Sequence, residues 1–335
     1  MPPITSQVSF PSHTGATEAM IVSRAASSGA KGKSTPMPRK SGRVDPIELN
    51  VVLKSRMRIR QLIFALTACG LAAVVSSARA QSAERLPIFD AHVHYSHDAW
   101  EMVPPDVALK LVRDAGVRRV LVSSSDDDGQ QRLVKLAPDV FLPSLRPYRQ
   151  RGDQSVWARD PTVVGYLEER LAKYRYVALG EFHIYGADVD LPVPRRMIEL
   201  ARKHKLVLHS HSDADAIDRQ FAQWREARIL WAHAGFDSPA NVRAMLKKHR
   251  NLWCDLAFRS DHAPSGQLDA EWHALMLEYP DRFMVGTDTF TPERWPFIVE
   301  HARWSRQWLA GLPPAVAERI AYKNGEALFA DALGK

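Results

Sequence analysis

Short apolar runs alternate with amphipathic segments from Leu86 to near the end of the chain. Runs of three or four apolar residues are typical of buried strands, and apolar residues at three- and four-residue spacing are typical of helices. The predicted strands cover residues 86–89, 120–122, 140–142, 176–179, 206–208, 229–232, 252–254 and 283–285.

Prolines mark several of the predicted helix starts. Pro104 and Pro105 precede a helix whose apolar face carries Val107, Ala108, Leu111, Val112 and Ala115. Further helices are predicted at 161–172 and 194–203, from the cap Ser238-Pro239, and from Pro292 nearly to the end.

Eight strands alternating with helices over about 250 residues have the size and rhythm of a single-domain α/β protein, the (β/α)₈ TIM barrel. A doubly wound open sheet is the alternative. The chain lacks the glycine-rich fingerprint of a dinucleotide site, which argues against the Rossmann form of that alternative.

Charge is distributed unevenly along the 335 residues, whose formal net charge is +7. Residues 1–80 hold 11 Lys and Arg against 3 Asp and Glu, whereas 81–335 hold 34 against 35. The nearly neutral body argues against a nucleic-acid partner, which is usually met by a basic surface. Residues 1–56 are rich in Ser, Pro, Gly, Ala and Lys without apolar periodicity, which predicts a disordered tail or a mis-called start.

A secretory signal is predicted from Met57 to Ala80. Arg58 and Arg60 precede an apolar run at 62–75, and Ala78-Arg79-Ala80 supplies a cleavage site. We expect cleavage after Ala80 and a mature domain at 81–335 that is periplasmic or secreted. The apolar run is short for a bilayer span, so no stable span is expected after cleavage; an uncleaved N-terminal anchor is the alternative.

The chain has only two cysteines, Cys69 and Cys254, which excludes a disulfide scaffold. Cys69 stands in a sequence similar to a lipoprotein cleavage box, and this ranks below cleavage at Ala80 because the apolar run continues past it. A homo-oligomer is left open.

Potential metal ligands follow the ends of five predicted strands. In a barrel the C-terminal ends of all strands meet at one mouth, so these side chains are expected to converge. Imidazole and carboxylate groups suit divalent Zn, Mn or Fe. The strand-end segments contain His92 and His94, Glu181, His209, His233 and Asp288.

These segments resemble the amidohydrolase superfamily of metal-dependent hydrolases. The resemblance rests on Phe89-Asp90-Ala91-His92-Val93-His94, His209, Ala232-His233-Ala234-Gly235 and Gly286-Thr287-Asp288, and covers 86–330 with a similar closing helix at 321–329. It implies that His92, His94, His209 and Asp288 are metal ligands and that His233 is a ligand or a catalytic electrophile.

Glu181 departs from the many binuclear members that carry a carboxylated lysine on the fourth strand. A glutamate there is similar to the metal-dependent deoxyribonuclease branch, where it is a metal ligand. The decarboxylase-like branch, with aminocarboxymuconate-semialdehyde decarboxylase, instead holds one metal and uses the histidine of the sixth strand. One or two ions therefore remain open, with Zn favoured over Mn or Fe.

Other polar residues near the mouth are candidates for substrate binding. His183 and His211 lie two residues beyond predicted ligands, and Arg146 and Arg259 could clamp a carboxylate or phosphate, as could Arg149 beside Tyr148. Asp126–Asp128 is expected to be a solvated turn or helix start. Trp304 and Trp308 share a helix face and are expected in the core, while Trp295 is considered for a pocket wall.

The resulting hypothesis is a hydrolase in which metal-activated water attacks a small anionic amide, ester or lactone. Asp288 would move the proton and His233 would polarise the scissile bond or bind metal. Two alternatives remain: a mononuclear decarboxylase of a small carboxylic acid, and an exported metal- or ligand-binding protein without turnover.

Overall fold

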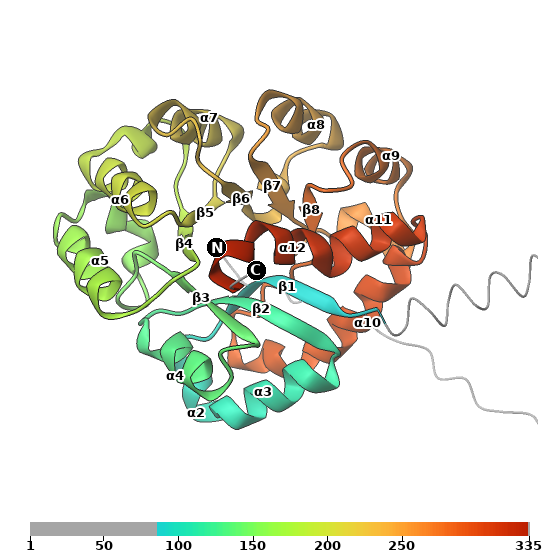
Figure 1. Cartoon of the computed structure of the whole chain (residues 1–335), viewed down its shortest axis with the longest axis horizontal. Helices are drawn as coiled ribbons and strands as arrows, with labels where there is room; N and C mark the ends of the chain where they lie inside the picture. The colour runs from blue at the N-terminus through green and yellow to red at the C-terminus, as the bar shows by residue number, and fades with distance from the viewer. Residues whose placement is uncertain (1–85, 334–335) are drawn as a thin grey trace, which may run out of the picture. The chain divides into compact units, whose positions relative to one another are not determined.

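The computed structural model describes residues 86–333, in which eight parallel strands form a barrel (Figure 1). Each strand pairs with the next along the chain, and the bond from the Ala91 amide to the Val285 carbonyl, 2.9 Å, joins the first strand to the residue directly after the last. The (β/α)₈ prediction is confirmed. The strands are β1 Ile88–His94, β2 Val117–Ser123, β3 Phe141–Leu145, β4 Ala178–His183, β5 Val207–His211, β6 Ile229–Trp231, β7 Leu252–Asp255 and β8 Phe283–Met284.

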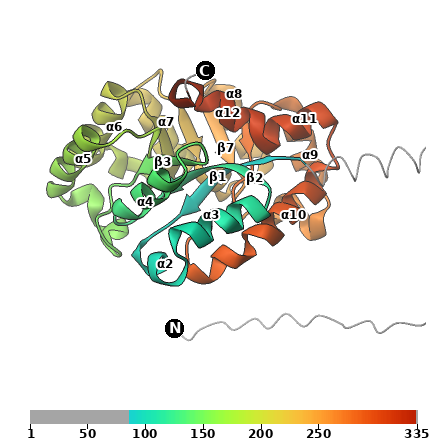
Figure 2. The same ribbon diagram turned by 60° about the horizontal axis from the view of Figure 1, so that its bottom comes forward.

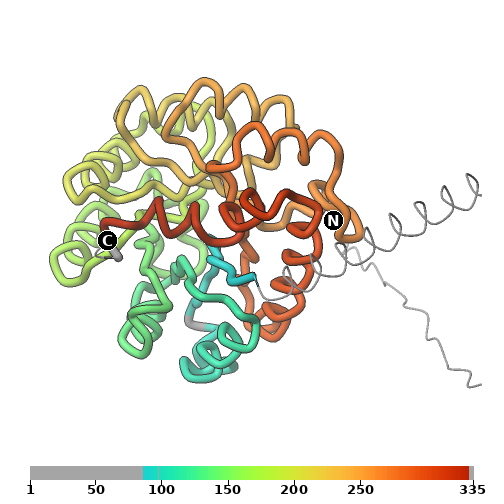
Figure 3. The backbone as a smooth tube through the Cα atoms, turned by 45° about the vertical axis from the view of Figure 1, so that its right-hand side comes forward, coloured from blue at the N-terminus to red at the C-terminus, as the bar shows by residue number. Residues whose placement is uncertain are grey.

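Helices follow the strands and form the outer ring of the barrel, whose succession along the chain is traced in Figure 3. The predicted starts at Pro105 and at Ser238-Pro239 are confirmed, and Ser238 Oγ accepts a hydrogen bond from the Asn241 amide. The α-helices are α2 His97–Met102, α3 Pro105–Asp114, α4 Asp128–Leu136, α5 Thr162–Lys173, α6 Pro192–Lys203, α7 Ala214–Gln223, α8 Pro239–Lys248, α9 Ala270–Glu278, α10 Ile298–Leu309, α11 Pro314–Glu318 and α12 Asn324–Leu328.

The prediction of nearly continuous helix after Pro292 is wrong in detail. A 3₁₀ segment, Pro292–Phe297, precedes α10, and the helix stops at Leu309 before α11 begins at Pro314. Gly311 and the two prolines 313 and 314 interrupt the helix because glycine and proline disfavour helix interiors.

The C-terminal helix α12 closes one end of the barrel. Figure 1 shows α12 lying across that end, and Figure 2 shows it on the opposite side of the barrel from α2, which follows β1. Phe329 stacks on Phe89 with ring centroids 5.7 Å apart, at the start of β1. The amino-terminal ends of the strands are therefore covered, and the carboxyl ends are left for the site.

One expectation about packing changes with the structure and another is confirmed. Residues 126–128 were expected to form a solvated turn or helix start, and α4 does begin at Asp128. Asp127 is nevertheless buried, and its Oδ2 accepts hydrogen bonds from Arg170 Nε at 2.7 Å and Tyr176 Oη at 2.6 Å. Trp308 is buried as expected, with Trp304 packed beside it at a centroid distance of 6.4 Å.

None of the helices within residues 86–333 combines the length and apolar character needed to cross a bilayer. The predicted tail, signal segment, cleavage site at Ala80 and Cys69 lie outside the described residues.

Candidate metal centre

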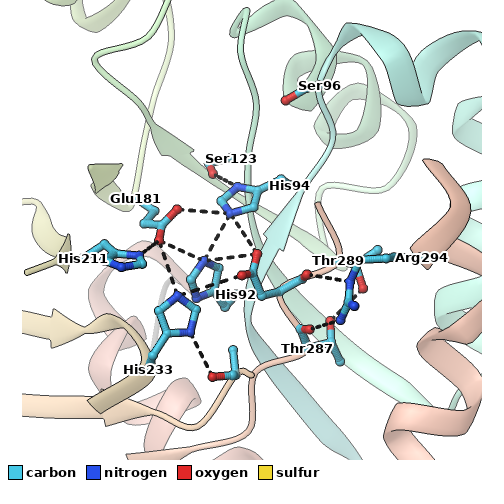
Figure 4. Close-up of polar contacts among 12 residues, drawn as sticks. His92, His94, Ser96, Ser123, Glu181, His211, His233, Thr287, Thr289 and Arg294 are labelled. Atoms are coloured by element: carbon cyan, nitrogen blue, oxygen red, sulfur yellow. Dashed lines mark hydrogen bonds and ion pairs between the residues drawn. The ribbon is translucent and has the colours of Figure 1, made fainter. Parts of the chain in front are cut away.

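The two histidines at the end of β1, His92 and His94, bring their Nε2 atoms close together. His92 and His94 are separated by one residue on an extended strand, so both side chains point into the barrel. Their Nε2 atoms lie 3.1 Å apart, and both side chains are buried (Figure 4). Two imidazole nitrogens at this distance either share a proton or share a cation.

Two carboxylates complete this arrangement, Glu181 from β4 across the barrel and Asp288 from the segment after β8, beside β1. Glu181 Oε2 and Asp288 Oδ1 each lie 3.2 Å from His94 Nε2. Glu181 Oε1 lies 3.6 Å and Asp288 Oδ1 3.7 Å from His92 Nε2. The structure thus brings together residues from β1, β4 and the segment after β8, as the sequence predicted.

Glycine at position 180 allows β4 to deliver Glu181 to this point. Gly180 has φ +131°, and a Cβ placed there would lie 2.0 Å from the backbone oxygen of His209. Any other residue would therefore separate β4 from β5 or change its backbone conformation.

His233 reaches the same cluster from a left-handed turn after β6. Its φ is 56°, and its Nε2 lies 3.7 Å from Glu181 Oε1 and 3.9 Å from Asp288 Oδ2. The Ala257 carbonyl, 2.8 Å from His233 Nδ1, accepts the Nδ1 proton (Figure 4). In the neutral ring Nε2 therefore carries a lone pair directed at the carboxylates.

His92 and His94 both have polar partners at Nδ1. Asp255 Oδ2 lies 3.2 Å from His92 Nδ1, a contact that fixes the tautomer leaving Nε2 free to bind a metal. His94 Nδ1 lies 2.7 Å from Ser123 Oγ and 3.3 Å from Arg146 Nη1, and these two contacts orient the ring. Sequence reasoning missed Asp255; the available signal was an acidic residue directly after the predicted strand at 252–254.

The position of His209 differs from the one expected of a ligand. Its Nε2 lies 3.1 Å from Asp255 Oδ2, and it belongs to none of the candidate ligand groups within residues 86–333. The strand register explains this, because His209 pairs with Gly180, one level deeper in the barrel than the pair His183 and His211. His211 Nδ1 instead contacts Glu181 Oε1 at 2.8 Å.

His183 and His211 form a second group with Glu181. Their rings stack with centroids 4.0 Å apart, and His183 Nε2 lies 3.8 Å from Glu181 Oε1. Tyr148 Oη lies 3.1 Å from His183 Nδ1. Glu181 therefore stands between two groups of imidazoles.

The buried charges at this end of the barrel favour a cation. Although burial opposes the charged ring, the carboxylates of Asp288, Asp255 and Glu181 hold the pKa of His92 well above its usual value. Burial also opposes ionisation of Glu181, but His92 and His183 keep its pKa well below the usual range. Among the described residues, these three buried carboxylates have one buried guanidinium in direct contact, that of Arg146, whose Nη2 is 3.2 Å from Glu181 Oε2.

The donor set fits a divalent metal ion. Asp288 Oδ1 is buried and accepts no hydrogen bond from the described residues. One group of potential ligands is His92, His94 and Asp288, a second is Glu181, His183 and His211, and a third is His92, His233 and Asp255. Imidazole and carboxylate donors that converge in this way suit Zn, Mn or Fe.

A cavity of about 400 Å³ opens over this cluster. Its walls include Arg146, Tyr148, His183 and His211 together with the metal-site residues His94, Glu181 and Asp288. The cavity is large enough for a small organic molecule.

Some predicted pocket residues lie elsewhere. Arg259 lines a different cavity, and both oxygens of Asp261 accept its hydrogen bonds at 3.0 and 2.6 Å. Arg149 is held by Asp153 and Asp160. Trp295 is buried against Tyr95, with ring centroids 5.4 Å apart, and does not border the cavity over the metal cluster.

Barrel and cluster together define a metal-dependent hydrolase-like enzyme of the TIM-barrel class. The chain belongs to the amidohydrolase family, whose model matches residues 89–330. The comparison with curated proteins finds no match.

Solved structures share the fold at low identity. An uncharacterised TIM-barrel protein from Bordetella bronchiseptica is 13% identical, with a TM-score of 0.52 over 75% of this chain and 100% of that one. A probable 2-pyrone-4,6-dicarboxylic acid hydrolase from Acinetobacter baumannii, with citric acid bound, is 11% identical, with a TM-score of 0.51 over 72% of this chain and 99% of that one. A protein provisionally named a metal-dependent hydrolase, from Lactobacillus casei, is 11% identical, with a TM-score of 0.50 over 76% of this chain and 98% of that one.

Proposed function

We propose that this protein hydrolyses an amide, ester or lactone bond in a small substrate that carries a carboxylate. The observation that supports this most directly is the meeting of His92, His94, Glu181 and Asp288 beneath a cavity that Arg146 also lines. A guanidinium beside the reacting centre favours an anionic substrate. The neighbour from Acinetobacter baumannii, named for a dicarboxylic acid substrate, is consistent with this proposal.

The proposed ligands of the first ion are His92, His94 and Asp288, with Glu181 beside them. His233 is assigned as a further ligand rather than an electrophile, because its Nδ1 proton is taken by the Ala257 carbonyl and its Nε2 lone pair faces the carboxylates. The group of Glu181, His183 and His211 offers a second ion the same donor types. Zn²⁺ is the proposed metal, since it is commonly bound by imidazole and carboxylate.

A bound divalent ion supplies Lewis acidity, which polarises the scissile carbonyl and makes water more acidic. Asp288 is the proposed general base, because its Oδ1 is buried beside His94 and has no other hydrogen-bond donor among the described residues. The same oxygen would return the proton to the leaving group. Arg146 orients the substrate carboxylate and holds Glu181 in place through Nε and Nη2.

The proposal includes export of the mature domain after cleavage at Ala80. Its support is the sequence order of Arg58 and Arg60, the apolar run and Ala78-Arg79-Ala80. N-terminal sequencing of the protein recovered from the periplasm and from the medium tests this part separately.

The decisive experiment combines metal analysis with a substrate panel. Purified protein is assayed on lactones, esters and amides with and without a carboxylate, and CO₂ release is followed on the free acids. The double variant His92→Ala/His94→Ala should lose bound metal and turnover, whereas His204→Ala, at an exposed position on the outer ring, should keep both. Full activity in metal-free protein would contradict the hydrolase proposal, and CO₂ release without hydrolysis would favour the decarboxylase.

A further inference from the structure

Exposed aromatic side chains gather at the carboxyl ends of the strands. Five aromatic residues are prominently exposed among the described residues, and four of them lie in the segments that follow β4, β6, β7 and β8. We call these four the aromatic rim: Tyr185 (52% exposed), Phe236 (55%), Phe258 (46%) and Phe290 (46%). The fifth, Phe297, precedes α10.

The rim is continuous with the candidate metal centre. Phe236 stacks on His233 with centroids 4.5 Å apart and planes 14° apart, and its ring is 5.9 Å from that of His211. Tyr185 meets His211 edge-on at 6.2 Å. On the other side Phe258 lies 6.3 Å from His233 and 5.8 Å from Phe290. Phe290 lines the cavity over the metal centre, and Phe258 lines the neighbouring cavity that also contains Arg259.

Stability does not explain this arrangement. Phe236 and Phe258 have φ values of 52° and 55°, in the left-handed region that is unfavourable for bulky residues. Such a conformation costs free energy, and a half-exposed phenyl ring recovers little of it by burial. Backbone strain of this kind concentrates at sites that bind ligands.

Arg294 fixes the rings of the rim near β8. Its guanidinium lies 4.3 Å from the Phe258 centroid and 5.6 Å from that of Phe290. Its Nε donates to the Asp288 carbonyl at 3.1 Å and its Nη2 to the Thr287 carbonyl at 3.2 Å (Figure 4). The rim is thus anchored to the segment that carries the proposed general base.

The remainder of the mouth is polar. The segments after β1, β2 and β3 contribute polar residues to the cavity wall, among them Ser96, Asp98, Ser125, Arg146, Gln150 and Arg151. Arg151 is paired with Asp98, so Arg146 is the guanidinium nearest the metal centre. A molecule seated over the metal centre would meet these polar groups on one side and the Phe290 ring on the other. Its far end would reach the rings of Phe236 and Phe258 by extending past His233, which both rings contact.

We propose that the aromatic rim binds an aromatic ring of the substrate, so that the substrate is an aryl-bearing carboxylate whose scissile bond lies between ring and acid. This inference rests on the proposed function, because it assigns the substrate class of the same site. Phe236 and Phe258 are specificity-determining residues, with Phe236 closest to the metal centre through its stack on His233.

Ligand binding tests the rim without requiring turnover. The full-length, metal-loaded protein is titrated with 3-phenylpropionate and with propionate, which share the carboxylate and differ in the ring. The aromatic acid should bind about tenfold more tightly or better, because it buries a ring that propionate lacks. Phe236→Leu and Phe258→Ala should each remove most of that difference, whereas Phe297→Ala should not change it.

Turnover and assembly separate the remaining outcomes. A preference in kcat/KM for aryl over alkyl esters, lost in the same two variants, supports the proposal. Aromatic-selective binding with no hydrolysis of any substrate overturns the hydrolase function but keeps the rim assignment. Equal binding of both acids, or a wild-type dimer that Phe236→Leu/Phe258→Ala converts to a monomer without altering ligand binding, overturns the rim assignment.

Discussion

Asp255 is expected to influence the metal affinity of the site although it is not among the proposed metal ligands. Its side chain is fully buried, and both oxygens are occupied. Oδ1 accepts the amides of His233 and Ala257, each at 3.1 Å. Oδ2 faces His92 Nδ1 at 3.2 Å and His209 Nε2 at 3.1 Å.

The substitution Asp255→Asn preserves the shape of the side chain but replaces one hydrogen-bond acceptor, a carboxylate oxygen, with a donor, the amide NH₂ group. The amide oxygen must stay where two backbone amides donate, so the NH₂ group must face His92 Nδ1. His92 can accept that hydrogen bond only if its own proton moves to Nε2, the atom that lies 3.1 Å from His94 Nε2. The lone pair needed for metal binding is then lost.

Partners of this kind are typically worth 10–100-fold in metal affinity, which is about 1.4–2.7 kcal/mol. Calorimetric titration of chelator-treated protein with Zn²⁺ measures the effect, and thermal melts of the metal-free variants check folding. Asp218→Asn is the matched control, because Asp218 contacts His249 Nε2 at 2.6 Å between α7 and α8. A folded Asp255→Asn protein that binds Zn²⁺ as tightly as the wild type would refute the tautomer argument.

Three further outcomes are expected. His262 is buried among Trp272, Trp304 and Trp308 without a hydrogen-bond partner in the described residues, and burial lowers its pKa to about 4. The unfolded chain takes up the proton first, so stability present above about pH 6.5 is lost as the pH falls to 4, by about 3 kcal/mol for this residue. In urea unfolding, the free energy of unfolding of His262→Leu should fall by about 3 kcal/mol less than that of the wild type between these pH values. An equal fall in both proteins would count against the argument. Gly180→Ala should destabilise the protein by about 3 kcal/mol or more and lower its metal content, because the new Cβ would collide with the His209 carbonyl. The control is Gly165→Ala, at a position on α5 where a Cβ meets open space, and equal melting temperatures for the two variants would contradict the prediction. Arg146→Lys should raise KM for carboxylate substrates about tenfold, since lysine cannot make the same forked contact with a carboxylate. KM for neutral esters should change less in this variant, and Arg195→Lys, on the surface, should leave both KM values unchanged.

Apolar patterning along the chain determined the fold and most of the candidate site. Eight short runs and the helices between them define the barrel, and barrel geometry alone sends His92, His94, Glu181, His233 and Asp288 to one mouth. That inference needs only the strand ends, which the sequence marks by the change from apolar to polar residues.

Only the tertiary structure decided which of two neighbouring histidines, His209 or His211, contacts Glu181 at the metal centre. His209 and His211 both follow the rule that alternate residues face the same side, so periodicity cannot choose between them. The register of β4 against β5 places His209 beside Asp255 and His211 beside Glu181. Likewise the partners of Arg259 and the contacts of the aromatic rim depend on loop conformations, which are set by long-range packing and by backbone strain at particular residues rather than by local pattern.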